Sequence, residues 1–576
     1  MCRFLFILSI RVVVSLILTG IVPLSAQAIG HRPADSETRP ADSETRPADF
    51  ETRPASSEPW TADSEPIKCL TPWIMLHGQD PESVEPHIRR KIEDVVTQDM
   101  ETTETYQSAS GRFQLVFNRD GFHAVPGNDE NNSGIPDYIE RASEYADYSW
   151  QRQVEEMGFA DPAADGPLTI EFRNIGSRTY GYTIQDGSST RIVVHHNFIN
   201  FPPNDDPEGN QPGALKVTIA HELKHAIQFA TNQWQGDAGT THWIEMDATM
   251  MENIVFPKVN DYYNYIRGDW GIFGNPRKST PVAYSHVTWS LFFAEHLGIA
   301  YWVDVWEEIR RDPVIPMIQA MTQALSSDPV TGSNRLRELI ARNYLWHAAS
   351  GIRTVDGYGF TESAAYPDAA IEPVPDTLAD GYNVSDQLST ISSAFWMFYP
   401  ESDQVGQISL SKIHSHSNSV IGVLGYFNDG TTAEWIPETD PGGLTQKTSR
   451  FTVSRLDSII IAVTNTDPHE PASFHLEFQI RSLPDVVVLE PNYPNPFSEK
   501  SGNPGTIIPF SVPEREHVVV AVYDVTGRKV ARLFDREADP GHYLVPFNAQ
   551  GLASGVYIYQ IRAGSVRKTG KMTFVR

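Results

Sequence analysis

The hydrophobic positions change their spacing twice along the chain. Residues 137–158 carry a helical pattern, and branched and aromatic residues at 168–174 and 191–198 predict strands. From Ala214 to about Ala348 the apolar residues recur with helical spacing. Beyond Asp376 short alternating segments are separated by Asn, Asp, Gly and Pro. The pattern predicts a multidomain α+β chain, with a small sheet and helices followed by two β-sandwiches.

Composition divides the chain further. We expect a signal segment at 1–28, a repeat spacer at 29–66, an N-terminal or pro-like region at 67–120 and a mixed α+β domain at 121–375. A β-sandwich at 376–482 and a smaller immunoglobulin-like sandwich at 483–576 are expected to follow. The sequence leaves open whether 67–120 is a removable pro-segment or the first layer of the domain that follows.

The first residues indicate export. Arg3 and Arg11 precede an apolar run that ends at Ala26-Gln27-Ala28, which is typical of a secretory signal peptide cut after about Ala28. The apolar run is short for a membrane span and no second one follows, so we expect no transmembrane span in the mature chain. The proline-containing repeat RPADSET then has too few apolar side chains to form a core, which predicts a spacer.

Charge and cysteine content narrow the partners. With 73 acidic and 45 basic side chains the net charge is -28, which argues against nucleic acid or anionic lipid as a partner. Of two cysteines, Cys2 leaves with the signal, so Cys69 has no intramolecular disulfide partner. We interpret Cys69 as a small buried residue. Stability must then come from cores and from bound metal.

The stretch VTIAHELKHAIQF, at 217–229, predicts a metal site. On a helix, residues four apart lie about 40° apart around the axis, so His221 and His225 can reach one ion. Glu222 is rotated away and can touch a water on that ion. Apolar residues flank the three on both sides, and buried histidines without a partner would be costly.

A catalytic zinc needs a third protein ligand and an open position. Glu245 follows His225 by twenty residues on the next predicted helix, and an antiparallel helix can bring its carboxylate back to the metal. Three histidines are alternatives: His242 is close to Glu245 in sequence, and His195 and His196 lie on a strand that we expect at a sheet edge.

The HExxH motif with Glu245 resembles the gluzincins, the thermolysin-like clan of zinc peptidases. The run AHELKHAIQF followed by WxxExxxxxxE is similar to a group of secreted bacterial metallopeptidases. The resemblance implies a zincin-like catalytic domain, a zinc cofactor and a protein or peptide substrate. It also implies Glu222 as general base, and Tyr284 and His286 as donors to the oxyanion.

One position departs from the thermolysin pattern. Thr249 stands where that family has an aspartate that orients a histidine. We expect Asp247 or Glu252 to orient a ligand instead. The strand at 191–198 is expected to run along the cleft and pair with an extended substrate.

A second metal site is predicted in DENNSGIPDYIE. Oxygen ligands, one of them a backbone carbonyl, follow the calcium-loop spacing, with glycine at the sixth position and a helix directly after. The expected calcium ligands are Asp129, Asn131, Ser133, Ile135, Asp137 and Glu140. The other interpretation is a turn capped by Asp137.

The last 90 residues or so carry specific motifs. Residues 492–497 read NYPNPF, residues 522–530 read VYDVTGRKV, Gly555-Val556-Tyr557 follows, and the final strand is basic. These resemble the C-terminal sorting domain of type IX secretion cargo. The resemblance implies export through the periplasm of a diderm bacterium to its surface or surroundings, with the type IX machinery as a partner.

Two functions fit these features. The first is a secreted zinc metalloendopeptidase. The second is a surface adhesin or glycan-binding protein in which zinc is structural and the sandwich binds the ligand. Hydrolysis requires Glu222, whereas metal retention does not.

Overall fold

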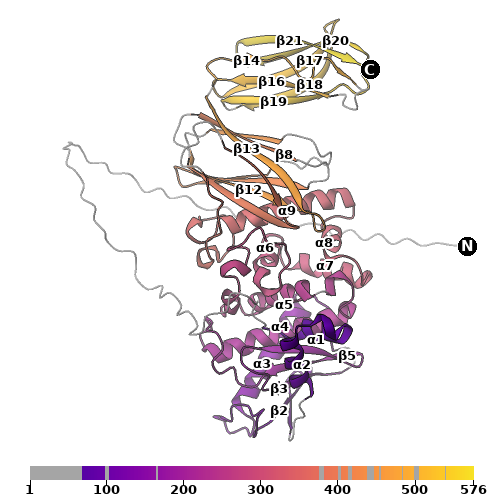
Figure 1. The fold of residues 1–576 in the computed structure, drawn as a ribbon, viewed down its shortest axis with the longest axis vertical. Coiled ribbons are helices and arrows are strands. Elements are labelled where there is room, and N and C mark those ends of the chain that lie inside the picture. The colour runs from indigo at the N-terminus through magenta and orange to yellow at the C-terminus, as the bar shows by residue number, and fades with distance from the viewer. Residues whose placement is uncertain are drawn as a thin grey trace, which may run out of the picture. The chain divides into compact units, whose positions relative to one another are not determined.

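The computed structural model describes residues 68–97, 103–163, 166–239, 241–374, 382–399, 404–412, 418–436, 447–452, 456–482, 484–498, 505–538 and 540–576. The expected signal segment and repeat spacer lie outside these residues. Figure 1 shows the mixed α+β region, coloured indigo to magenta, followed by β-sheets coloured orange to yellow.

A short helical segment comes first. It comprises α1 (Thr71–Gln79), η1 (Pro81–Ser83) and α2 (Pro86–Thr97). Val84, Ile88 and Ile92 form a small apolar cluster of their own, with partly buried residues of α1 packed against it. Ile88 and Ile92, four residues apart, lie on one face of α2, and Val84 lies in the extended chain just before this helix.

A five-stranded sheet follows, in the order β1-β2-β3-β5-β4. Its strands are β1 (Glu104–Gln107), β2 (Phe113–Phe117), β3 (Leu168–Arg173), β4 (Gly181–Asp186) and β5 (Ser189–His195). β2, β3 and β5 are parallel, and β1 and β4 pair antiparallel at the two edges. The sheet therefore begins before residue 120, and the strand predicted at 191–198 is interior. The edge strand is β4, so the expectation that 191–198 lies at an edge was wrong.

Both faces of this sheet are covered. Successive side chains of β5 point to opposite faces: Ile192 and Val194 enter the main core, and Val193 packs on the other side with Leu70. The first face carries α3 (Asp137–Trp150) and α4, and the second carries the segment that contains α1. The run of apolar residues in β5 is thus explained by burial on both sides.

The helical half continues the main core, as the spacing from 214 to 348 predicts. Its α-helices are α4 (Asn210–Asn232), α5 (Thr241–Val255), α6 (Val287–Leu297), α7 (Ala300–Arg311), α8 (Met317–Leu325) and α9 (Pro329–Ala348). Large buried aromatics such as Trp289, Trp302 and Tyr344 fill the space between them. Among the described residues, we find no helix with the length and apolar character needed to cross a bilayer.

Two four-stranded sheets form the first sandwich, in the orders β10-β9-β12-β7 and β11-β8-β13-β6. The strands are β6 (Tyr382–Leu388), β7 (Ser392–Phe398), β8 (Gln404–Lys412), β9 (Ser419–Phe427), β10 (Thr432–Trp435), β11 (Lys447–Thr452), β12 (Leu456–Asn465) and β13 (Ala472–Ser482). In β12, Ile460 joins the core shared with α9, while Ile459 and Ile461 join the core between the sheets.

The last sandwich has a three-stranded sheet, β14-β16-β19, and a five-stranded sheet, β15-β21-β20-β17-β18. Its strands are β14 (Val488–Leu489), β15 (Phe497–Ser498), β16 (Gly505–Val512), β17 (Glu516–Asp524), β18 (Lys529–Ala538), β19 (Gly541–Asn548), β20 (Gly555–Ala563) and β21 (Val566–Val575). The buried Tyr559 hydroxyl donates to the Glu490 carbonyl at 3.0 Å and accepts from the Asn492 amide at 3.1 Å, which fixes the start of the NYPNPF motif.

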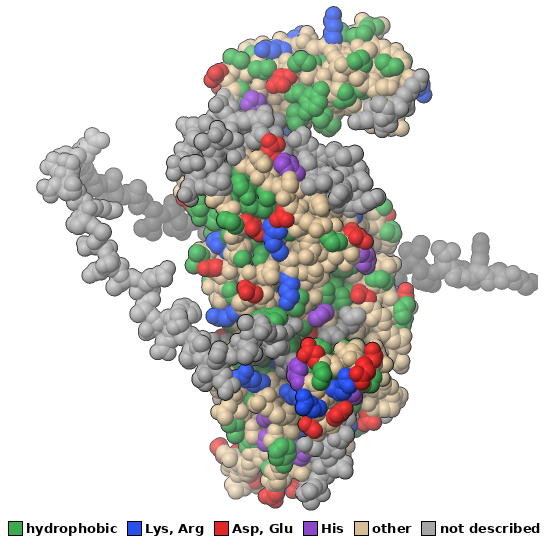
Figure 2. Space-filling model, viewed as in Figure 1, with side chains coloured by type: hydrophobic (Ala, Val, Ile, Leu, Met, Phe, Trp, Pro, Cys, Tyr) green, Lys and Arg blue, Asp and Glu red, His purple; other side chains and the backbone are tan. Residues whose placement is uncertain are grey.

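On the face shown in Figure 2, acidic and basic side chains of the described residues are interspersed, and the basic ones do not gather into one area.

Candidate metal centre

The two histidines of the HExxH motif lie in the middle of α4, which is buried on nearly all sides. α4 lies between the sheet and α5, so its polar and charged side chains are buried together with its apolar ones. α5 carries Glu245, whose side chain is 2% exposed. Figure 1 shows α4 and α5 side by side, and this packing brings the three residues together.

Four ligand atoms converge at this point. Nε2 of His225 lies 3.1 Å from Nε2 of His221 and 3.0 Å from Oε1 of Glu245, and Nε2 of His221 lies 3.3 Å from Oε2 of Glu245. The fourth atom is Sγ of Cys69, 3.5 Å from Nε2 of His225. All four lie within 4.8 Å of one another, and in the described part of the chain they are the one such group of metal-ligating side chains.

Neighbouring side chains orient both imidazoles. Nδ1 of His221 is 2.8 Å from Oε1 of Glu252, and Nδ1 of His225 is 2.8 Å from Oε1 of Gln228. Gln228 in turn donates its amide to Asp247 at 2.8 Å. Because these oxygens accept, each histidine donates from Nδ1 and keeps the lone pair on Nε2. The lone pairs face Glu245.

This arrangement fits a cation. The carboxylate oxygens of Glu245 are buried and receive no hydrogen bond, although two imidazole nitrogens lie within 3.3 Å. Lone pairs at this distance repel unless a positive charge lies between them. Burial alone would lower the pKa of His221, but Glu245 and Glu252 outweigh it and raise that pKa to about 10, so without a bound cation His221 takes up the positive charge as a proton. The donor set of one sulfur, two imidazoles and one carboxylate suits a tetrahedral ion.

The interpretation of Cys69 as only a small buried residue was therefore incomplete. It is 1% exposed, as expected, but its sulfur belongs to the ligand group. Sequence spacing could not indicate this, because Cys69 lies more than 150 residues before His225 and reaches it through the fold. Gln228 was also missed, although its position three residues after His225 puts it on the same helix face.

Glu222 lies beside the cluster, under β4. Its Oε2 accepts from Thr183 Oγ1 at 2.8 Å and lies 3.4 Å from Thr71 Oγ1. Burial, the largest influence, raises the pKa of Glu222, and the charges of His221 and His225 oppose it. A Cβ on Gly181 would lie 2.9 Å from Oε1 of Glu222. β4 can approach this carboxylate so closely because that position is glycine.

The two expected oxyanion donors have different surroundings. The Tyr284 hydroxyl accepts a hydrogen bond from the Lys68 amide at 3.0 Å, next to Cys69 in the chain. His286 is buried, with Nδ1 3.1 Å from Thr280 Oγ1. Tyr284 therefore contacts the segment that reaches the cluster, and His286 contacts the core beside it. Their roles stay predictions.

The alternative third ligands lie elsewhere. His196 places Nδ1 2.6 Å from the Ala124 carbonyl, and Nδ1 of His195 accepts from the amide of Phe198. These two and His242 are absent from the converging group, which contains Glu245.

The two residues expected to orient a ligand both lie at the site. Glu252 contacts His221 directly, and Asp247 acts through Gln228 and lies 3.4 Å from Lys224 Nζ. From the helix that carries Glu245, Glu252 therefore contacts His221, whereas Thr249 does not, and the orienting role of Glu252 stays a prediction. Thr249 donates its hydroxyl to the Glu245 carbonyl at 2.8 Å.

The expected calcium loop folds around its first residue. Asp129 accepts from the amides of Ser133 and Gly134, both at 2.9 Å, and Gly134 has φ +86. Asn131 donates to Glu140 at 2.8 Å, and the Ser133 hydroxyl lies 3.3 Å from the Ile135 carbonyl.

The remaining calcium residue, Asp137, begins α3 and accepts from the Glu130 amide at 3.1 Å. The expected ligands therefore share one exposed loop that internal hydrogen bonds hold, and calcium binding there stays a prediction.

Comparison with protein families assigns the end of the chain. Residues 492–575 match the family described as secretion system C-terminal sorting domain. These residues are a type IX secretion sorting domain. The protein is therefore cargo of that machinery, and it is secreted or attached to the cell surface of a diderm bacterium.

Other comparisons add little about the site. No curated protein matches the chain. Solved structures with local similarity include PliG, a periplasmic lysozyme inhibitor from Aeromonas hydrophila, at 14% identity over 19% of this chain and 94% of that one, with a TM-score of 0.15. A β-1,2-glucanase from Parabacteroides distasonis matches at 10% identity over 35% of this chain and 33% of its own, with a TM-score of 0.13. The chain thus spans about a third of the glucanase.

Proposed function

We propose that this exported protein is a zinc-dependent endopeptidase with a zincin-like domain that carries the HExxH helix. The observation that carries the proposal is that His221, His225 and Glu245 point their Nε2 and carboxylate oxygen atoms, all of them lone-pair donors, at one place. Glu222 is buried beside them. Two imidazoles and one carboxylate are a ligand set that catalytic zinc sites use.

The reaction divides among a few groups. Zinc held by the three ligands supplies Lewis-acid polarisation of the substrate carbonyl and lowers the pKa of a water. Glu222 takes a proton from the attacking water and passes it to the leaving amine, so the peptide C–N bond breaks and the water is divided between the two products. Tyr284 is the residue that we propose as donor to the oxyanion.

The rival function, an adhesin or glycan-binding protein with a structural zinc, has one observation in its favour. Four protein ligands, counting Cys69, are typical of structural zinc sites. Glu222, however, is a buried carboxylate next to the ligands, and threonine hydroxyls are its hydrogen-bond donors. A structural zinc site does not require such a group. This favours the peptidase.

The test is hydrolysis of an unfolded protein by the zinc-loaded chain, assayed intact and after limited proteolysis. We expect Glu222→Gln to keep one zinc per chain and its thermal transition, and to lose activity by about 10²–10⁴-fold. Glu155→Gln, at a partly exposed pair with Arg112, is the matched control and should behave as the parent. Equal activity of Glu222→Gln and parent, or no hydrolysis by either form, would exclude the peptidase.

A further inference from the structure

The chain just before α1 runs along the free edge of β4. The Tyr180 amide donates to the Lys68 carbonyl at 2.9 Å, and the Leu70 amide donates to the Gly181 carbonyl at 3.2 Å. Cys69 thereby pairs with Gly181 in parallel. Within the described residues β4 otherwise pairs with β5 alone. The segment 68–71 therefore occupies the sheet edge nearest to the metal centre.

This short segment touches both parts of the proposed catalytic apparatus. Cys69 brings its sulfur to the fourth position of the ligand group, 3.5 Å from His225. Two residues later, the Thr71 hydroxyl lies 3.4 Å from Glu222 and 3.2 Å from the Cys69 sulfur. A catalytic zinc keeps one ligand position open. Here Cys69 covers that position, and Thr71, two residues later, covers Glu222, the proposed base.

Lys68 anchors the segment. Its Nζ lies 2.6 Å from Glu252 and 2.6 Å from Asp261, all three side chains being at most 1% exposed. Tyr180 and Tyr265 add their ring faces at 4.6 and 5.0 Å from Nζ. Glu252 also accepts from His221, so the anchor is attached to the residue that orients a ligand.

The segment and the helices after it are separable from the main core. Val84, Ile88 and Ile92 form their own cluster, and Leu70 and Val95 pack on the outer face of the sheet. None of these belongs to the core that contains α4 and α5. Displacement of the segment would expose the outer sheet face and withdraw Cys69, Thr71 and Met75 from their contacts with α4 and α5.

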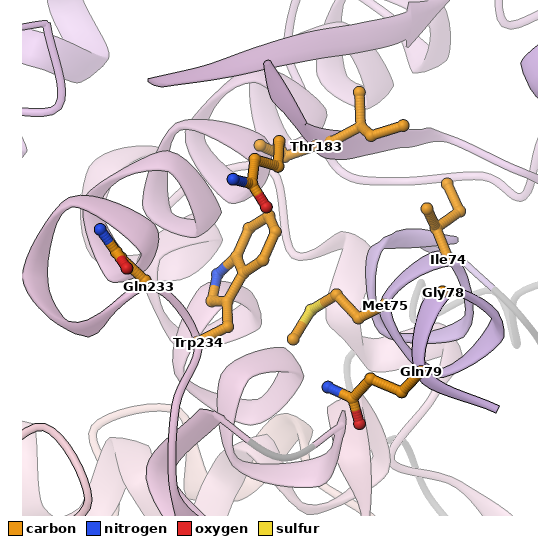
Figure 3. A pocket seen from close by; sticks show the side chains of 9 residues that line it. Ile74, Met75, Gly78, Gln79, Thr183, Gln233 and Trp234 are labelled. Atoms are coloured by element: carbon orange, nitrogen blue, oxygen red, sulfur yellow. The ribbon is translucent and has the colours of Figure 1, made fainter. Parts of the chain in front are cut away.

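A cleft continues from this edge. Ile74, Met75 and Gln79 of α1 line one side, and Thr183 of β4 and Trp234 beyond α4 line the other, around a volume of about 310 Å³. In Figure 3 the Met75 and Trp234 side chains point toward each other from the two sides. α1 therefore forms one wall of this groove, and Thr183, the hydrogen-bond partner of Glu222, lines the opposite wall.

We propose that Lys68–Thr71 is an inhibitory plug, in which Cys69 is the fourth ligand of the metal and the N-terminal helical segment holds the peptidase latent until it is displaced. The proposal rests on the proposed function. On displacement the thiolate leaves the metal and takes up a proton, and water enters its place. The β4 edge becomes free at the same time to pair with an extended peptide substrate.

Cobalt spectroscopy tests the ligation without relying on activity. The probe is the full chain loaded with Co²⁺, with Cys2 replaced by serine so that Cys69 is the single thiol. We expect a sulfur-to-cobalt charge-transfer band that Cys69→Ser abolishes, while cobalt stoichiometry and the thermal transition persist. A parent chain without this band would overturn the proposal.

Activity tests the latency. Zinc-loaded Cys69→Ser should hydrolyse an unfolded protein at least tenfold faster than the untreated parent, and limited proteolysis that removes the segment should raise the parent to the same level. A parent already as active as both would overturn the plug and leave the peptidase standing. A charge-transfer band with no hydrolysis by any form would instead exclude the peptidase and leave Cys69 in a closed structural site.

The anchor provides a second variant that leaves the metal ligands in place. Lys68→Met removes the buried cation between Glu252 and Asp261, and we expect it to increase the rate at which iodoacetamide labels Cys69 in the zinc-loaded chain by at least tenfold. Arg90→Met, at an exposed residue of α2 that bonds to the Pro86 carbonyl of its own helix, is the matched control. Equal labelling rates in the two variants would contradict the role of Lys68.

Discussion

At the scale of single residues, Glu252 has two tasks. One carboxylate oxygen accepts from Nδ1 of His221 at 2.8 Å and the other pairs with Lys68. We predict that Glu252→Gln lowers zinc affinity about 10–100-fold, because an amide is a weaker acceptor and leaves the imidazole less basic. Competition with a chelating dye measures this. Glu155→Gln is the control, and an affinity equal to that of the parent would show that Glu252 does not orient the ligand.

Gly181 is the second residue whose replacement is informative. A Cβ there would lie 2.8 Å from the Val193 carbonyl oxygen and 2.9 Å from both Glu222 and Thr218. Backbone cannot easily yield, so Gly181→Ala should cost about 1–3 kcal/mol in the free energy of unfolding, measured with denaturant. Gly127→Ala, where a Cβ meets nothing within 4 Å, should change it by less than about 0.5 kcal/mol. Equal effects would contradict the close approach of β4.

Residues in one helix were the easiest to predict from the sequence. His221 and His225 share a helix face by their spacing alone, Glu222 follows His221 directly, and Glu245 follows from the length of chain that a return helix needs. Cys69 and Lys68 were not predicted as part of the site, because contacts between residues so far apart depend on how β4 is covered. A sequence pattern predicts which face of a helix or strand is buried, but not which segment of the chain packs against that face.

At the scale of elements, the loop before α3 has the spacing and the turn of a calcium site, with Gly134 at φ +86. We predict that millimolar Ca²⁺ stabilises the protein by about 1–3 kcal/mol, seen as a higher thermal transition. Asp129→Asn should abolish this gain, because it removes the charge at the first position. Glu130→Gln, at a position that supplies no ligand, should retain it. A transition that does not respond to Ca²⁺ in the parent would exclude the site.

The strands show where element prediction ends. Branched residues identify β3 and β5 as strands, but they do not indicate which strands pair with them in the sheet. β5 is apolar on both sides because it is interior, and the same run of residues was read as an edge strand beside the cleft. β4 is the edge strand on that side, and its residues pass from buried to exposed along the strand without alternation.

At the scale of the whole molecule, export and chemistry belong to different parts of the chain. The sorting domain is recognisable from short motifs, and its NYPNPF start is held inside the same domain by the contact of Asn492 with Tyr559. The metal centre needs segments from residue 69 to residue 245. The sequence therefore predicts the ligands on the two neighbouring helices, but not the cysteine that comes from a distant segment.

The most direct test of the metal centre is an anomalous difference map at the zinc edge, from crystals of the zinc-loaded full chain. We predict one peak bonded to Nε2 of His221, Nε2 of His225 and the Glu245 carboxylate at about 2.0–2.2 Å, and to the Cys69 sulfur at about 2.3 Å. A map without a peak between these atoms, or with its principal peak at His195 and His196, would contradict it.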